Sequence, residues 1–253
     1  MTGLTSTTPY LSNSGRTRAT TVLLAVGIVL NIIMLILGLL QINLLSEMAG
    51  GAVVPEDDIS ANDMRVGLAS LLLLGLRLVT AVVFLLWIHR AYRNLPALGN
   101  PRQQLEYSPG WAAGYFFIPI LNLFVPFRVV KEIWRKSEPD VGTGESYMFY
   151  PPEAPALIGV WWAFWIASLF ADRISYTFLN RADGPNSMLT GTWAMEVALI
   201  LEIIAAVLAI LVVRGINDRQ EKRSQLVTLL NAAPPPPPLF TQPAPTPEQT
   251  SGQ

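Results

Sequence analysis

The residues of this sequence that could do chemistry are ionisable groups placed inside long apolar runs. Arg77 and Glu202 each lie eleven residues from the end of such a run, and Asn31 lies twelve residues into another. At ~1.5 Å per helical residue, all three would sit about 16 Å deep in a membrane. A charge at that depth costs at least ~2.5–3.5 kcal/mol, so such groups tend to face the bundle interior and find partners. We therefore expect a central polar layer made of Arg77, Glu202 and Asn31.

A second polar layer is expected nearer the outer surface. Arg173 and Glu196 would both lie about 25 Å from the inner boundary, and Asp172 is the chain neighbour of Arg173. Two interpretations remain open. Acids paired with bases at their own depth would hold the helices together and set their register. Alternatively, Glu202 and Glu196 belong to a path for protons or ions. Because each acid has a base at its depth, the structural interpretation is favoured.

Composition removes much of standard enzyme chemistry. The chain has no cysteine and one histidine, so disulfides, thiolate zinc sites and multi-histidine metal sites are excluded. No phosphate loop, dinucleotide fingerprint, zinc-protease motif or nucleophile elbow is present. A net charge of −1 gives no excess of Lys and Arg to neutralise nucleic-acid phosphates. We expect no catalytic residue, no metal, no cofactor and no nucleic-acid partner.

The elements that must position these residues are membrane helices. The chain is 51% hydrophobic and 14% charged, whereas soluble proteins are about a quarter charged. Backbone groups in lipid must be satisfied within a helix, and about 20 residues are enough to cross. We expect an all-α, polytopic membrane protein whose membrane domain covers residues 19–215. Its four spans are predicted at about 19–45, 66–88, 156–179 and 192–213.

The distribution of Lys and Arg predicts the orientation. One side of the membrane would carry thirteen of these residues, and the other only Arg65 and Arg181. Cytoplasmic loops carry the excess of positive charge. Both termini are therefore predicted to be cytoplasmic.

One apolar segment does not fit a simple span. Residues 110–127 are interrupted by Pro119 and Pro126, with Asn122 between them. As a fifth span this segment would move the later basic residues outside, against the charge rule. We expect a re-entrant or interfacial segment over 110–136 on the cytoplasmic side, whose last part has the pattern of an amphipathic surface helix.

A basic inner face follows from this arrangement. Lys and Arg near a membrane surface attract anionic lipid headgroups by about 1 kcal/mol each, although the same residues also serve to determine topology. The lipid bilayer is thus an expected partner, and a protein partner or a homo-oligomer is possible. The expected headgroup-binding set is Arg90, Arg93, Arg128, Lys131, Arg135 and Lys136, with Trp111 and Trp134.

The two ends of the chain lack hydrophobic periodicity. Residues 1–18 are rich in Thr, Ser and Gly, and we expect a disordered cytoplasmic arm. Residues 216–253 include the run Pro234 to Pro238 and are expected to form a disordered, proline-rich tail. The tail could be a ligand for a proline-binding domain or only a solvated end.

The middle of the chain resembles a known family. The residues that carry the resemblance are WIHRAYRNLPALG at 87–99 and YSPGWAAGYFFIPILNLFVPFRVVKEIWRKS at 107–137. They resemble a bacterial membrane-protein family catalogued as domain of unknown function 4328, over roughly residues 65–215. The resemblance implies a shared architecture, in the cytoplasmic (inner) membrane of a bacterium, and implies no activity.

Two classes of function remain open. We expect a non-enzymatic scaffold or partner-binding subunit whose basic inner face contacts lipid. The alternative is a subunit that transports a small solute or ion through a polar pathway at the membrane midplane. Broken helices such as 110–127 are common where transporters line a cavity. Transport predicts that water reaches Glu202, whereas scaffolding predicts a dry and paired Glu202.

Overall fold

Four long helices dominate the computed structural model of the chain, which describes residues 9–100, 102–139 and 154–232. Each of the four is long and apolar enough to cross a membrane, and the described residues contain no strand. The expectation of an all-α polytopic protein with four spans is confirmed. The long helices are α1 (Ser14–Ala49), α2 (Glu56–Arg93), α6 (Ala156–Asn180) and α7 (Pro185–Ala232).

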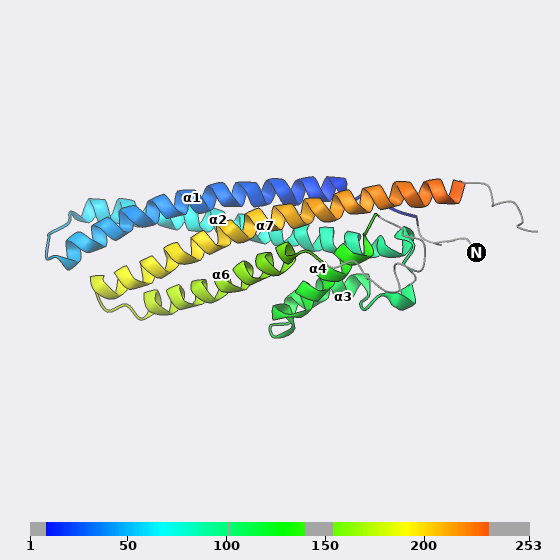
Figure 1. Cartoon of the computed structure of the whole chain (residues 1–253). Helices are drawn as coiled ribbons and strands as arrows, with labels where there is room; N and C mark the ends of the chain where they lie inside the picture. The colour runs from blue at the N-terminus through cyan, green and yellow to red at the C-terminus, as the bar shows by residue number, and fades with distance from the viewer. Residues whose placement is uncertain (1–8, 101, 140–153, 233–253) are drawn as a thin grey trace, which may run out of the picture.

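The long helices alternate in direction. As a result, α1 begins and α7 ends at the same end of the molecule, which we call the terminal end (Figure 1). The short connections from α1 to α2 and from α6 to α7 lie at the opposite end, the loop end. The first contains Gly51 with φ +84°, a backbone conformation that favours glycine. The second leads directly into Pro185, whose fixed φ suits the first turn of a helix.

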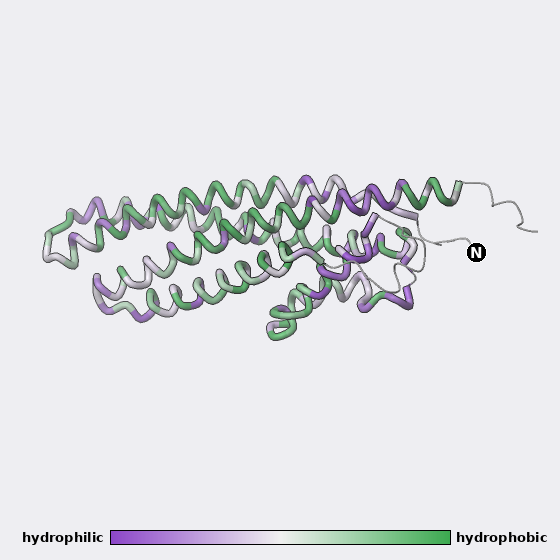
Figure 2. Tube along the Cα trace, in the orientation of Figure 1, coloured by the Kyte–Doolittle hydropathy of each residue, from purple (hydrophilic) through white to green (hydrophobic). Residues whose placement is uncertain are grey.

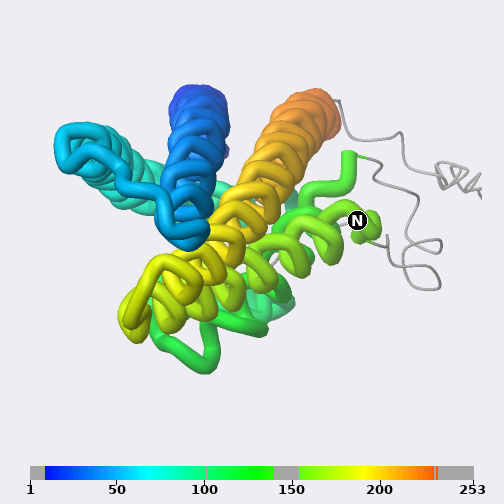
Figure 3. The backbone as a smooth tube through the Cα atoms, turned by 90° about the vertical axis from the view of Figure 1, so that its left-hand side faces the viewer, coloured from blue at the N-terminus to red at the C-terminus, as the bar shows by residue number. Residues whose placement is uncertain are grey.

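Helix α7 is the centre of the bundle. It packs extensively against α6 and α1, whereas α2 packs mainly along α1 and touches α7 little. Viewed along the bundle, α2 stands to one side, away from α6 (Figure 3). Large apolar side chains such as Leu71 and Leu78 point outward from α2. Hydrophobic residues cover the middle stretch of the bundle, as expected for a surface that faces lipid (Figure 2).

The terminal end holds the main hydrophobic core. Trp87, Ile88 and Tyr92 of α2 are fully buried, together with Ile133 and Ile216. Short elements complete this end, because the chain between α2 and α6 folds back against it. They are η1 (Leu95–Leu98), η2 (Arg102–Gln104), α3 (Pro109–Gly114), η3 (Tyr115–Phe117), η4 (Leu121–Leu123) and α4 (Val125–Lys136).

Residues 109–136 form a hairpin, here called the broken hairpin, rather than a fifth continuous helix. Pro119 lies at the turn between η3 and η4, where it cannot donate a helical hydrogen bond. At the tip, Phe117 and Ile120 are both 75% exposed. The indole of Trp162 in α6 donates to the carbonyl of Leu123 at 2.9 Å, which ties the tip to the bundle. A broken segment in place of a fifth span was the expectation from sequence.

The expected boundaries of the membrane domain need correction at both ends. Disorder over 1–18 is wrong for residues 14–18, which belong to α1, and the Asn13 amide donates to the carbonyl of Trp87 at 3.1 Å. Disorder over 216–253 is wrong for residues 216–232, because α7 continues through them. The stretch stays helical because Ile216 and Gln220 are buried against the terminal core. Residues 1–8 and 233–253, with the proline run, lie outside the described residues.

Candidate binding cavity between the membrane helices

A cavity of about 440 Å³ lies between α1, α2, α6, α7 and the broken hairpin. This volume falls within the range of small-molecule sites, roughly 300–1,000 Å³. Its wall is mostly apolar, and the broken hairpin contributes Phe116, Phe117 and Asn122 to it. The aromatic residues of the wall are Phe84, Phe116, Phe117, Trp161, Trp162 and Trp165.

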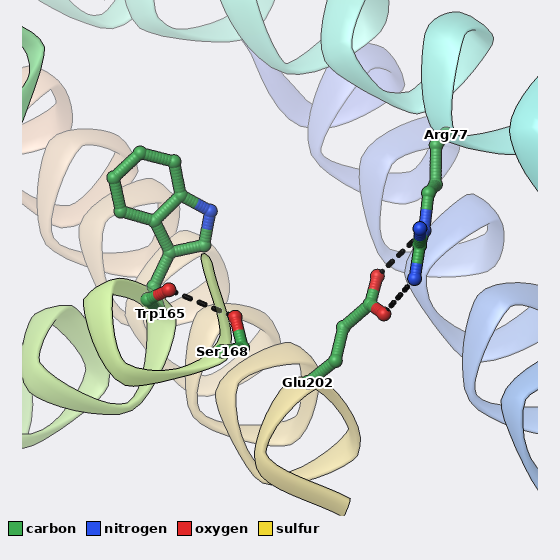
Figure 4. A network of polar contacts seen from close by, with 4 residues as sticks. All are labelled: Arg77, Trp165, Ser168 and Glu202. Carbon is green, nitrogen blue, oxygen red and sulfur yellow. Dashed lines mark hydrogen bonds and ion pairs between the residues drawn. The ribbon is translucent and has the colours of Figure 1, made fainter. Parts of the chain in front are cut away.

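An ion pair forms the polar centre of this cavity. The Arg77 guanidinium donates from Nε to Oε1 of Glu202 at 2.9 Å, and its Nη2 contacts Oε2 (Figure 4). Such a two-point contact fixes both direction and distance. The two side chains are nevertheless 39% and 26% exposed, because both line the cavity. The expected pairing of Arg77 with Glu202 is confirmed.

Asn31 completes the central layer from α1. Its side chain lines the cavity and is 2% exposed. Its Oδ1 has no hydrogen-bond partner among the described residues. The expected layer of Arg77, Glu202 and Asn31 is therefore present, although it borders a cavity rather than a closely packed interior.

Two hydroxyl groups of the wall donate hydrogen bonds to backbone carbonyls of their own helices. Ser168 donates to the carbonyl of Trp165 at 2.8 Å (Figure 4), and Thr80 donates to the carbonyl of Leu76 at 2.8 Å. Such bonds within a helix leave the hydroxyl oxygen free to accept from another group. The Ser168 and Thr80 hydroxyl oxygens are therefore possible hydrogen-bond acceptors on a wall that is otherwise mostly apolar.

Asp172 is the second carboxylate of the cavity. The sequence placed it in the outer layer beside Arg173, but the structure places it on the cavity wall with Arg77 and Glu202. Within the described ranges the ion pairs are Arg77 with Glu202 and Arg219 with Glu138, so Asp172 has no ion-pair partner there. The cavity thus contains two carboxylates and one guanidinium.

The expected pairing of Arg173 with Glu196 is wrong. Arg173 is exposed, and its guanidinium lies 5.4 Å from the centre of the Tyr176 ring on its own helix. Glu196 is 4% exposed and faces Gly38 of α1 instead. Equal depth along two helices does not make two side chains meet, since the direction around each helix axis must also match.

The predicted basic face divides into exposed and packed residues. Trp111 is 56% exposed, and Lys131 lies 5.8 Å from the centre of the Phe127 ring. Trp134 is covered by the Arg219 guanidinium at 4.5 Å, so it belongs to the contact between α4 and α7. The exposed basic residues of the set are Arg93, Arg128 and Arg135, and the partly buried ones are Arg90, Lys131 and Lys136.

A buried acid at the terminal end escaped the sequence analysis. Glu132 of α4 accepts from the Tyr92 hydroxyl at 2.7 Å and from the Glu106 amide at 2.9 Å. The Tyr107 amide in turn donates to the Tyr92 hydroxyl at 2.8 Å. Burial raises the pKa of Glu132 above its ordinary value. The available signal was position: Glu132 lies three residues after Val129 and therefore on the apolar face of its helix.

Comparison with known proteins identifies a family and no close relative. The family model described as "Domain of unknown function (DUF4328)" matches residues 51–218. Neither a curated protein nor a solved structure matches the chain. The matched region contains α2, the broken hairpin, α6 and most of α7, and so most of the cavity wall.

Proposed function

The chain belongs to the family described as Domain of unknown function (DUF4328), and because that description states no activity, we propose a function from the central cavity. We propose that the protein is a non-enzymatic binding subunit of the bacterial cytoplasmic membrane. It holds a compact amphiphilic cation in the cavity. Its basic inner face rests on anionic lipid headgroups and leaves the bundle available to a protein partner or a second copy.

The observation that carries this proposal is the combination of aromatic walls with an excess of negative charge. Trp165 and its aromatic neighbours line the cavity together with Asp172, which has no ion-pair partner among the described residues. Aromatic faces attract cations by about 0.5–2 kcal/mol, more when water is excluded. A second carboxylate beside the Arg77 and Glu202 pair adds Coulomb attraction in a medium of low dielectric constant.

The same chemistry disfavours other occupants. A lipid acyl chain would place methylene groups against the Arg77 and Glu202 pair and remove the exposed part of that pair from polar contact. An anionic headgroup would meet two carboxylates and only one guanidinium, which is already engaged. A compact molecule with a cationic group and an apolar body satisfies both parts of the wall.

The path into the cavity is proposed to run from the bilayer. Helix α2 packs along α1 and makes little contact with the helices on the other side of the cavity. Small movements of α2 can therefore widen the space without breaking the contacts between α6 and α7. In this proposal the terminal end faces the cytoplasm, because it carries most of the Lys and Arg residues outside the spans.

The test uses two probes of matched size and opposite charge. Tetraphenylphosphonium and tetraphenylborate are titrated into the purified protein, and quenching of tryptophan fluorescence is recorded. We expect saturable quenching by the cation only. Asp172→Asn should weaken binding of the cation several-fold, whereas the matched control Asp63→Asn, an exposed acid on α2, should leave it unchanged. Equal quenching by both ions, or equal affinity in Asp172→Asn, would refute the proposal.

Transport is the second candidate, and one observation favours it. The broken hairpin contributes Phe116, Phe117 and Asn122 to the wall, as broken helices do in many transporters. Transport of the cation would require the hairpin tip to move away from Trp162. Flux of tetraphenylphosphonium into proteoliposomes, lost in Asp172→Asn, would establish transport. Binding without flux would leave the binding-subunit proposal.

A further inference from the structure

Glu196 is a buried carboxylate that the proposed function does not use. It lies in α7, its residue is 4% exposed, and its Oε1 has no hydrogen-bond partner. Arg173, the base at its depth, points to Tyr176 instead. An unpaired carboxylate in an apolar setting is costly, so the group must be neutralised in some other way.

The Glu196 carboxylate lies directly against Gly38 of α1. A Cβ placed on Gly38 would collide with Oε1 of Glu196, so a larger residue there would force the carboxylate to move. The carboxylate occupies the space that the absent side chain leaves against the backbone of α1. Glu196 is therefore held inward between α1 and α7, and does not reach past them to the surface.

A separate cavity of about 240 Å³ adjoins this carboxylate. It shares no lining residue with the central cavity. Three residues bring further oxygen atoms to its wall: Gln41 from α1, Ser70 from α2 and Thr192 from α7. The Thr192 hydroxyl donates to the carbonyl of Met188 at 2.9 Å, which leaves its oxygen lone pairs for another partner. The rest of the wall is apolar, with Met34, Val66, Leu179 and Met195.

We propose that Glu196, with the oxygens of Gln41 and Thr192, forms a site for a monovalent alkali cation of the size of Na⁺. Carboxylate, amide and hydroxyl oxygens are the ligands that hard cations prefer. One carboxylate balances one positive charge, and sites for Ca²⁺ usually use several carboxylates. The cavity has room for the ion and a few waters, each of which takes about 30 Å³.

None of the described residues that line this cavity carries a positive charge. Glu196 is the one titratable residue among those that line the cavity. Two basic residues of the neighbouring helices, Arg65 of α2 and Arg173 of α6, are both exposed. Only a mobile cation or a proton can therefore neutralise the carboxylate. The inference stands independently of the occupant of the central cavity.

The experiment measures protection of Glu196 from a hydrophobic carbodiimide, which reacts with protonated carboxyl groups in apolar surroundings. The purified protein is treated in Na⁺ or in N-methylglucamine at equal ionic strength and equal pH, and modification is located by peptide mass spectrometry. We expect Na⁺ to slow modification of Glu196 several-fold and to leave modification of Asp172 unchanged, because Asp172 belongs to the other cavity.

If the carbodiimide does not modify Glu196 under either condition, a second measurement tests the proposal. Thermal unfolding is followed in Na⁺ and in N-methylglucamine, since a bound ligand stabilises the folded state. Wild type and the matched control Glu47→Gln should be stabilised by Na⁺, and Glu196→Gln should not. Modification that Na⁺ does not slow would overturn the proposal and leave a protonated structural acid. The proposal also fails if Na⁺ stabilises wild type and Glu196→Gln equally, or stabilises neither.

Discussion

The terminal end and the part of the bundle nearer the loop end are stabilised by different kinds of contact. At the terminal end, residues far apart in sequence exchange hydrogen bonds. Gln220 of α7 donates to the carbonyl of Ala91 at 2.9 Å, and Trp87 donates to the Thr17 hydroxyl at 3.0 Å. Between the long helices nearer the loop end, the described residues have few such bonds, and Arg77 with Glu202 is the prominent one. Apolar packing dominates there.

This difference makes a polar residue between the long helices a stronger indication of a specific structural or functional role than a polar residue at the terminal end. A polar group of the terminal end has many alternative partners, and bulk water lies within reach of its loops. A polar group between the long helices is surrounded by apolar side chains and is costly to leave unpaired. The two acids of α7 differ in this respect. Glu202 forms an ion pair with Arg77, whereas Glu196 has no ion-pair partner among the described residues and borders a separate cavity.

The largest effect is expected from removing the charge of Glu202. Glu202→Gln leaves the Arg77 guanidinium without its counter-ion and should lower the free energy of unfolding by about 2–3 kcal/mol. The value lies at the lower end for buried pairs because both side chains are partly exposed to the cavity. Exchange of the two residues, Arg77→Glu with Glu202→Arg, should recover part of the loss. Thermal unfolding in detergent measures both effects.

The matched control is the same substitution on the same helix. Glu196→Gln removes no hydrogen bond or ion pair that the described residues make. In sodium-free buffer we expect it to change the free energy of unfolding by less than about 1 kcal/mol. If Glu202→Gln and Glu196→Gln were equally destabilising, the contrast between a paired and an unpaired acid would be lost.

A second, somewhat smaller effect is expected at Gly38. Gly38→Ala places a methyl group where Oε1 of Glu196 lies, and overpacking of this kind costs about 1–3 kcal/mol. Gly75→Ala is the control, because a Cβ at Gly75 meets nothing within 4 Å. That change should be neutral or stabilising by up to about 1 kcal/mol, since alanine favours helix. Combining Gly38→Ala with Glu196→Ala should relieve the clash, and failure to do so would separate Gly38 from Glu196.

At the terminal end the corresponding test concerns Glu132. Glu132→Gln still accepts from the Glu106 amide but replaces the carboxyl acceptor of the Tyr92 hydroxyl by an amide group, at a cost of about 1 kcal/mol. The raised pKa of Glu132 also predicts a pH dependence. In the folded protein the Glu132 carboxyl group stays protonated at pH values above 4.5, its ordinary pKa. The stability that this group contributes is therefore fully present below pH 4.5 and is lost as the pH rises through the pKa of the folded state.

The measurement is the difference in melting temperature between wild type and Glu132→Gln across acidic to neutral pH. We expect the advantage of wild type to shrink as pH rises above 4.5. The exposed acid Glu106 provides the control, since Glu106→Gln keeps the backbone amide that Glu132 uses. A constant difference at all pH values would show that folding does not raise the pKa of Glu132.

The fold was predictable from the sequence because its strongest signal is the hydrophobicity of whole segments, which does not depend on any single residue. Apolar runs of about 20 residues identify membrane helices, and two prolines identify the break at Pro119 and Pro126. Both follow from backbone hydrogen bonding, which depends little on the rest of the structure. Local polarity was a weaker guide at the ends. Residues 216–232 were expected to be disordered, but Gln220 and Arg223 bind backbone carbonyls of η1 and α2, which keeps α7 helical.

The candidate site was predictable only in part, because depth and direction are separate quantities. Depth alone paired Arg77 with Glu202 correctly, since both also face the same space. Depth alone failed for Arg173 and Glu196, whose side chains point in different directions. Asp172 and Arg173 are neighbours in sequence, and successive helical residues are turned by about 100°. Neighbouring positions can therefore differ completely, and here Asp172 lies on the cavity wall while Arg173, expected to pair with Glu196, is exposed.

The smallest effect on stability is expected at the basic face, where a change of binding should occur without a change of fold. Arg128 and Arg135 are exposed on α4, and their replacement by glutamine breaks no described hydrogen bond or ion pair. Each lost charge should weaken attraction to anionic headgroups by about 1 kcal/mol, which is about a fivefold loss per residue. Native mass spectrometry of protein released from mixed anionic and zwitterionic lipid counts the lipids that remain bound.

The control for this face is Arg181→Gln, which removes an exposed positive charge at the loop end. If the terminal end faces the anionic inner leaflet, the double variant Arg128→Gln with Arg135→Gln should lose anionic lipids and Arg181→Gln should keep them. An equal loss per removed charge in the two variants would mean that bound lipid responds to net charge alone. Because both substitutions leave the hydrogen bonds of the terminal core in place, the melting temperature should stay constant while the lipid count changes. That separation would show that the terminal end is stabilised by its own polar contacts and uses its surface charge for lipid.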